Sequence, residues 1–177
     1  MKTTFACVVL TLLAPIAASA QDGRLQLEIL DRLAARASEK QEVTIDASMI
    51  ASVIPNLANA KTEAAKQVLS ELKGIFVRNF EFDDPKAYSM DDINTLRKQL
   101  AAPGWARIVS SEEKGKDGSW ELAEVYFFQQ AGKTNGIVII AAEPGELSVV
   151  NIVGPIDFNK LKELQGIFGI PAIPGVR

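Results

Sequence analysis

The 177-residue sequence has the length of one domain, a formal net charge of −3, no histidine and a single cysteine. The absence of histidine excludes Ser-His-Asp and Cys-His catalysis and histidine-based zinc sites, so we expect neither a metal nor another cofactor. Because nucleic-acid phosphates are bound by clustered lysine and arginine, the mildly acidic balance argues against a nucleic-acid partner.

The first twenty residues have the pattern of a secretory signal peptide. One lysine is followed by an uncharged apolar run, and small residues end the segment at Ala20. The run is shorter than the roughly 20 residues that span a membrane, so we expect cleavage between Ala20 and Gln21. Cys7 lies at the start of the run rather than at the cleavage point, so a lipoprotein is not expected. The pattern predicts an exported protein, periplasmic or secreted, with no transmembrane segment after cleavage.

The first half of the mature chain changes between helical and extended patterns. Leu25, Ile29 and Leu33 recur at helical spacing, whereas Val43 and Ile45 alternate with polar neighbours as in a strand. The patterns predict helices over 22–38, 49–54 and 62–72, strands over 42–46 and 75–82, and a helix that residues 89–92 cap and that runs to Leu100.

The second half has short strands separated by turn residues. Asp117-Gly118, Asn135-Gly136 and Pro144-Gly145 are strong turn signals, and they separate predicted strands over 105–111, 120–129, 136–142 and 147–153. A last helix is predicted over 157–168, followed by a Pro/Gly-rich tail over 169–177. The class is therefore α+β, with an antiparallel meander of about four to six strands and helices packed on one face. We expect a single domain over 22–168.

Five strand and turn segments together form a recognisable pattern. They are LKGIFVR at 72–78, PGW at 103–105, AEVY at 123–126, AAEPGEL at 141–147 and VGPID at 153–157. These segments resemble the bacterial DUF4252 domain family. The resemblance covers about residues 25–171, and it implies an exported protein of the bacterial envelope. The family has no assigned function, so it supplies no catalytic residues.

Two arginines within predicted strands are the candidate ligand-binding residues. Arg78 and Arg107, together with Tyr126, have the chemistry to hold an anionic ligand. The alternative is an ion pair across the sheet, for which Glu124 is a natural partner.

Other polar groups give weaker signals. The acidic residues at 81–84 and 91–92 lack the regular spacing of a calcium loop, and turn formation and helix capping explain them better. Lys66 and Ser70 share a helix face, but we expect both to be solvated, which does not suit a Ser-Lys dyad. No catalytic residue and no metal ligand is assigned.

Three functions follow, in decreasing order of support. The first is a non-enzymatic module that binds an envelope protein or another envelope component. The second is a periplasmic carrier of small anionic ligands or lipids, with a cleft lined by Arg78, Arg107 and Tyr126. The third is a hydrolase that uses Asp83 with Glu81 as a carboxylate pair. The sequence leaves the partner, the ligand and the oligomeric state open.

Overall fold

The computed structural model describes residues 22–170, except 58–62, 116–118, 158–159 and 161–162. The predicted signal peptide, its cleavage site at Ala20 and Gln21, and the tail over 171–177 lie outside the described residues. None of the described helices is long and apolar enough to cross a membrane.

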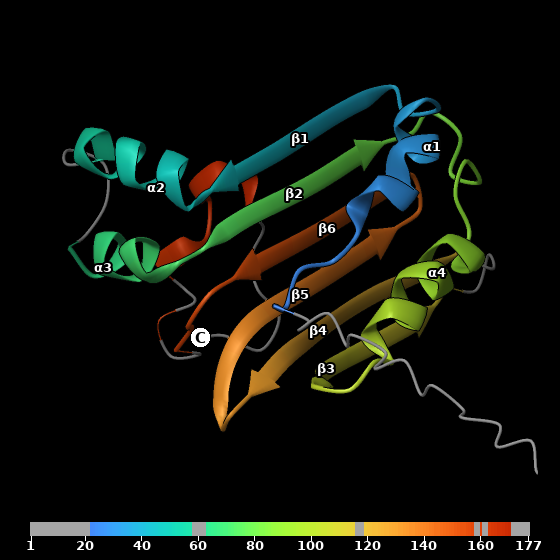
Figure 1. Cartoon of the computed structure of the whole chain (residues 1–177). Helices are drawn as coiled ribbons and strands as arrows, with labels where there is room; N and C mark the ends of the chain where they lie inside the picture. Colours follow the sequence, from blue (N-terminus) through green and yellow to red (C-terminus); the bar gives the residue numbers. More distant parts are fainter. Residues whose placement is uncertain (1–21, 58–62, 116–118, 158–159, 161–162, 171–177) are drawn as a thin grey trace, which may run out of the picture.

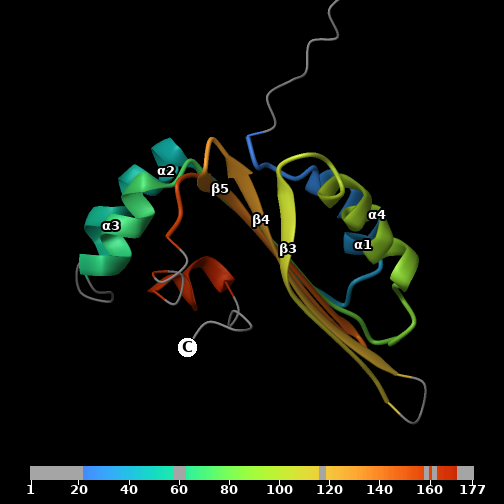
Figure 2. The ribbon, with the colours of Figure 1, turned by 90° about the horizontal axis from the view of Figure 1, so that it is seen from below.

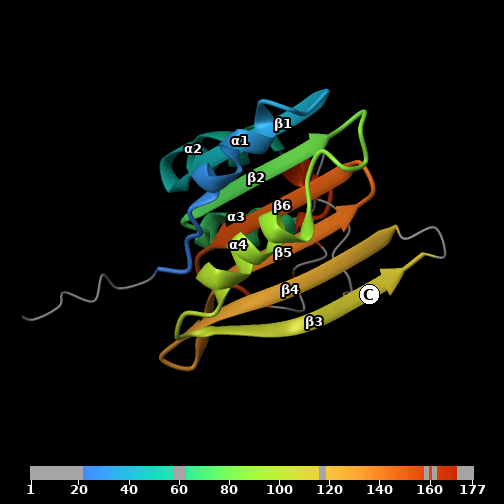
Figure 3. The same cartoon turned by 90° about the vertical axis from the view of Figure 1, so that its right-hand side faces the viewer.

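A six-stranded antiparallel sheet forms the centre of the fold, in the order β1-β2-β6-β5-β4-β3 (Figures 1 and 3). Strands β3 to β6 follow one another through hairpins, which confirms the predicted meander, and β2 pairs with β6 to add the first two strands. All strands but β2 are longer than predicted. Their bounds are β1 Glu39–Asp46, β2 Gly74–Glu81, β3 Trp105–Lys114, β4 Trp120–Gln130, β5 Lys133–Glu143 and β6 Glu146–Val153.

Helices cover both faces of the sheet, which confirms the α+β class but corrects the expected single helical layer. Figure 2 shows α2 and α3 on one side of the sheet and α1 and α4 on the other. Two separate apolar clusters fill the two interfaces. The central strands β5 and β6 carry apolar side chains on both faces, and each face needs its own cover. The helices are α1 Asp31–Ala34, α2 Ala47–Val53, α3 Glu63–Glu71 and α4 Met90–Leu100.

The helix predicted over 22–38 is much shorter in the structure. It consists of a 3₁₀ helix over Leu27–Leu30 followed by α1, and the residues before it are extended. The extended segment is held from outside, because the Leu25 N–H donates to Asn151 Oδ1 at 2.8 Å and the Gln26 N–H donates to Gln99 Oε1 at 2.9 Å. These long-range bonds replace the local helical bonds that the apolar spacing favoured.

The helix predicted over 157–168 is also not a continuous helix in its described part. A 3₁₀ helix is present over Ile167–Gly169. Gly166 and Phe168 have φ angles of 71° and 52°, in the left-handed region that an α-helix does not tolerate. Apolar spacing at Leu164 and Ile167 reflects burial in the core and not a helical stripe.

On the face under α2 and α3, side chains form rows that run across all six strands. The strand register places residues of neighbouring strands side by side in each row, although the pairing of β4 with β5 ends at Leu122 and Ala142, one residue before the last row. The outermost row consists of glutamates, and we call it the glutamate row. All of its side chains are exposed. One buried or partly buried row is Val43, Val77, Val150, Ile139, Val125 and Val109; the next is Gln41, Asn79, Ser148, Ala141, Ala123 and Ser111; the glutamate row is Glu39, Glu81, Glu146, Glu143, Glu121 and Glu113.

Candidate functional site

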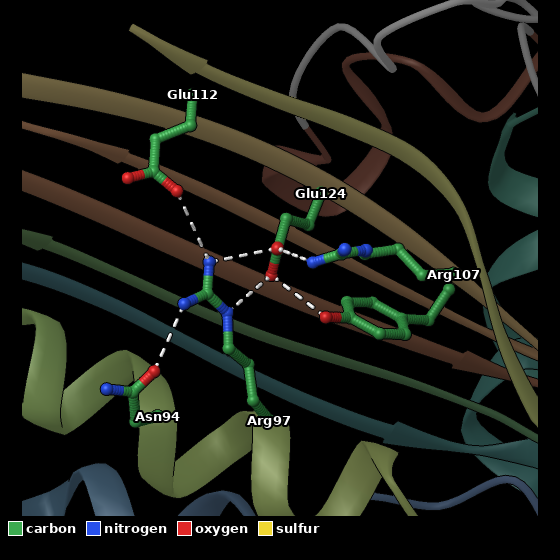
Figure 4. A network of polar contacts seen from close by, with 6 residues as sticks. Asn94, Arg97, Arg107, Glu112 and Glu124 are labelled. Carbon is green, nitrogen blue, oxygen red and sulfur yellow. Dashed lines mark hydrogen bonds and ion pairs between the residues drawn. The ribbon is translucent and has the colours of Figure 1, made fainter. Parts of the chain in front are cut away.

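Among the described residues, the side-chain group with the most hydrogen bonds is the carboxylate of Glu124 in β4. It is fully buried beneath α4 (Figure 4). It accepts hydrogen bonds from Arg97 Nη2 at 2.9 Å and Arg97 Nε at 3.1 Å. Arg107 Nη1 donates to it at 2.8 Å and the Tyr126 hydroxyl at 3.0 Å. Two cations and one hydroxyl therefore compensate one buried anion.

The register of the sheet explains how these groups meet. Tyr126 lies directly opposite Arg107 in β3, and Glu124 precedes Tyr126 by two residues and so shares its face. Arg97 comes from the last turn of α4, whose buried residues Ile93, Leu96 and Leu100 hold the helix over this face. Three of the four network residues are thus set by the paired strands β3 and β4, and Arg97 is set by helix docking.

The electrostatics of the network keep Glu124 ionised. Burial alone raises the pKa of its carboxyl, but the hydrogen bonds from Arg97, Tyr126 and Arg107 outweigh burial and hold that pKa below its ordinary value. The hydrogen bond to Glu124 raises the pKa of Arg97 and of Arg107. Burial, followed by the bond to Glu124, raises the pKa of Tyr126. All four groups keep their usual protonation states at neutral pH.

The structure brings together two of the three predicted ligand-binding residues. Arg107 and Tyr126 meet at Glu124, which confirms the alternative of a cross-strand ion pair for Arg107. Arg78 in β2 lies on the same face, but β6, β5 and β4 separate it from β3, or roughly 19 Å at the usual strand spacing. The three residues do not line one cleft.

Sequence reasoning missed Arg97. The signal was present in the helix pattern, because Arg97 follows the buried Leu96 and lies three residues before the buried Leu100. A cation at the margin of an apolar stripe is placed to reach a buried carboxylate on the facing strand. The facing strand is fixed only by the tertiary fold, so the partner was not visible in the sequence.

Arg78 has a different environment. Its Nη1 donates to the carbonyl oxygens of Val77 at 2.9 Å and Val43 at 3.2 Å. Its Nε is buried and makes no hydrogen bond to a described residue. No carboxylate of a described residue lies within ion-pair distance of its guanidinium. Its role as a ligand-binding residue stays a prediction.

The other candidate groups have local partners. Lys66 forms an ion pair with Glu63, and the Ser70 hydroxyl donates to the Gln67 carbonyl oxygen. In the acidic segment, the Asp84 carboxylate accepts from the backbone N–H of Lys86, as in a turn.

The other acidic residues of these two segments lie in different parts of the fold. Asp92 accepts from the Ser89 N–H and binds Arg32, which joins α4 to α1. Glu81 belongs to the glutamate row, while Asp83 is exposed in the following loop. Within the described part of the chain, no group of three or more acidic or cysteine side chains is placed to hold a metal ion.

These features define an α+β protein whose antiparallel sheet lies between two helical layers, with one buried ion-pair network between α4 and the sheet. A family model described as a domain of unknown function, DUF4252, matches residues 36–164. The chain belongs to this family, and the resemblance found in the sequence is confirmed. No curated protein matches the chain.

Proposed function

We propose that this chain is an exported protein of the bacterial envelope that acts as a non-enzymatic binding module. The observation that carries the proposal is the glutamate row, which places one exposed carboxylate on each of six adjacent strands. Like charges directly opposite each other destabilise a sheet. No lysine or arginine of the described residues lies within ion-pair distance of any member of the row. A cationic surface of a partner protein would compensate these charges.

The shape of the surface supports the same reading. Beside the row lies a row of small or polar side chains, several of them partly exposed. One hollow of about 230 Å³ is lined by Lys40, Gln41, Asn79 and two members of the glutamate row. A second, of about 180 Å³, includes Ala141, Ser148 and two further members. The proposed contact surface is this end of the sheet face.

The carrier function is the second candidate, and one observation favours it. Arg78 has no carboxylate partner among the described residues and a buried Nε that lacks an acceptor. Arg107 and Tyr126 argue the other way, because their hydrogen bonds are directed at Glu124. A carrier that used all three residues in one cleft would require the sheet to be rearranged.

Neutralising two adjacent members of the row is expected to stabilise the fold while weakening partner binding. Glu81 and Glu146 lie opposite each other, so the double change E81Q/E146Q removes a repulsion of about 0.5 kcal/mol. Urea unfolding measures the gain in the free energy of unfolding.

A photo-crosslinker at the exposed Ser111 tests partner binding. It should yield an adduct in intact cells with the unmodified row and much less with E81Q/E146Q. The pair E28Q/E71Q, which changes two exposed glutamates that lie outside the row and form no ion pair with a described residue, is the matched charge control.

The binding proposal fails if the adduct is equally abundant in the E81Q/E146Q protein, or if E28Q/E71Q reduces it to the same extent. Lower stability of E81Q/E146Q would show that the row is already compensated within the chain.

Export has its own test. Intact mass of the mature protein from an envelope fraction should correspond to a chain that begins at Gln21, and loss of ammonia from Gln21 would give pyroglutamate. The Ala-Ser-Ala pattern that ends at Ala20 is the basis of this expectation. A full-length mass, or recovery only from the cytoplasmic fraction, would overturn the proposed location.

A further inference from the structure

The guanidinium of Arg78 is used on one side only. Its Nη1 is bound by two strand carbonyl oxygens and lies 3.4 Å from the Thr44 hydroxyl. Its Nε has no acceptor although it is buried, and all three of its hydrogen bonds to described residues are made by Nη1. The Nε–Nη2 edge is the one that binds carboxylate or phosphate in a bidentate manner. A partly buried cation with this edge unfilled lacks a compensating anion.

The chain does not supply that anion from the adjacent strands. Glu42 lies directly opposite Arg78 in β1, on the same face, but its carboxylate is exposed and outside ion-pair distance. On the other side of Arg78 the neighbour is Val149 of β6. The carbonyl bonds of Nη1 hold the guanidinium against the β1–β2 backbone, away from Glu42.

A second cation lies beside the same strand pair. The guanidinium of Arg24 stacks on the ring of Phe76, with its central carbon 4.4 Å from the ring centroid. Phe76 precedes Arg78 by two residues and shares its face, and it lies opposite Thr44, whose hydroxyl contacts Arg78. Arg24 forms no ion pair with a described residue. Arg24 therefore lies over the Phe76 ring, and Arg78 follows two residues later on the same strand face, each without an ion-pair partner among the described residues.

We propose that Arg78 and Arg24, with the Thr44 hydroxyl, form a binding site for a phosphate-bearing anion on the β1–β2 part of this face. Nε of Arg78 is covered in this structure, so binding requires a small shift of the atoms around it. Arg78 then supplies the bidentate edge, Arg24 the second charge, and Thr44 a hydroxyl that can donate to a phosphate oxygen. Glu42 opposes anion binding by repulsion. The phosphate site lies on the opposite face of the sheet from the glutamate row. The proposed phosphate binding and the proposed protein contact can therefore be tested independently.

The test is a titration of the full mature chain with glycerol 1-phosphate at low ionic strength. Binding is measured by calorimetry or from changes in amide chemical shifts. R78Q is expected to weaken binding at least about tenfold, because it removes a charge-assisted bidentate contact. R78K keeps the charge without the fork and should weaken binding almost as much. R24Q should have a smaller effect, and E42Q should tighten binding severalfold. K133Q, which removes an exposed charge at the start of β5, should leave binding unchanged.

Two arms separate the possible sources of the phosphate. Sedimentation with phosphatidylglycerol vesicles, against phosphatidylcholine vesicles, reports a lipid headgroup, and the soluble phosphate ester reports a free metabolite. Binding in either arm that R78Q and R78K abolish supports the site. No binding in both arms overturns it, as does equal weakening by K133Q, or an R78K protein that binds like the unmodified chain.

Discussion

Replacing Arg97 with methionine is expected to lower the free energy of unfolding by about 3 kcal/mol, because it leaves a buried carboxylate with half of its charge compensation removed. Glu124 is fully buried, and Arg97 provides two of its four hydrogen bonds from a position that is itself only 23 % exposed. Methionine keeps most of the volume and the helix propensity of the arginine, so the loss reports the charge and not the packing of α4. Urea unfolding followed by circular dichroism measures it.

Arg107→Met is the matched control on the other side of the same carboxylate. The Arg107 side chain is 48 % exposed, so its contact with Glu124 is screened by water and the expected loss is about 1 kcal/mol. The order of the two effects is the test, since both changes remove one guanidinium from one acceptor. Equal losses, or a larger loss for Arg107→Met, would mean that burial of Arg97 adds nothing to the network.

The same network predicts the pH dependence of stability. The folded pKa of Glu124 is held below its ordinary value of about 4.3, so its contribution is complete above that pH and is lost as pH falls through the folded pKa. Glu124→Gln cannot ionise, and its deficit relative to the unmodified protein should shrink as pH is lowered from 6 to 3. A deficit that stays constant over this window would show that the ionised form is not the one that the arginines stabilise.

Alternation and turn residues were sufficient to predict the sheet, because both are local properties of the chain. The four strands from Trp105 onward were predicted from their turn signals, and strand pairing then aligns Arg107 with Tyr126. The apolar character of β5 and β6 on both faces indicated central strands, yet which helices cover which face is decided by docking between distant segments. Arg97 and Glu124 are 27 residues apart and meet only through that docking.

The N-terminal segment shows that apolar spacing alone does not distinguish a helix from an extended segment. Leu25 in the extended segment is buried, as are Leu27 and Leu30 in the 3₁₀ helix that follows it. Their spacing fits a continuous helix as well as a segment that lies across a sheet. The side chain that decides between the two is Asn151, which lies 126 residues from Leu25 and is the only described asparagine that is fully buried. An asparagine among the apolar residues of a central strand is unusual, because its buried amide needs hydrogen-bond partners. It therefore indicates that another backbone segment lies against the strand at this position.

Close approach of two glycines completes that pairing. Gly23 has a φ of 81°, and a side-chain carbon added to Gly136 would lie 3.0 Å from the Cα of Gly23. The segment therefore rests directly on the β5 backbone. Because predicted cleavage leaves only two residues before Gly23, the signal segment would be attached beside this contact.

Asn151→Ala is expected to lower the free energy of unfolding by about 2–3 kcal/mol, because three buried backbone groups each lose a hydrogen bond. The Asn151 amide accepts from the Leu25 N–H and donates to the Gly23 carbonyl oxygen at 2.9 Å and to the Ile137 carbonyl oxygen at 3.2 Å. Hydrogen exchange at the Leu25 amide should accelerate more than global unfolding accounts for. Ser148→Ala, which removes one partly buried hydrogen bond from the same strand, is the control and should cost about 1 kcal/mol.

Asn151→Asp separates the hydrogen bonds from the volume of the side chain. A carboxylate still accepts from Leu25, but it presents a second acceptor to the two carbonyl oxygens and buries a charge, so the loss at neutral pH should exceed that of Asn151→Ala. Burial without a cation raises the pKa of a carboxyl, and stability should therefore return as pH falls and the group is protonated. This sign is opposite to that of Glu124, whose contribution disappears in acid. An Asn151→Asp protein that loses further stability in acid, or a Leu25 amide that stays protected in Asn151→Ala, would show that Leu25 and Leu27 hold the segment through apolar contacts alone.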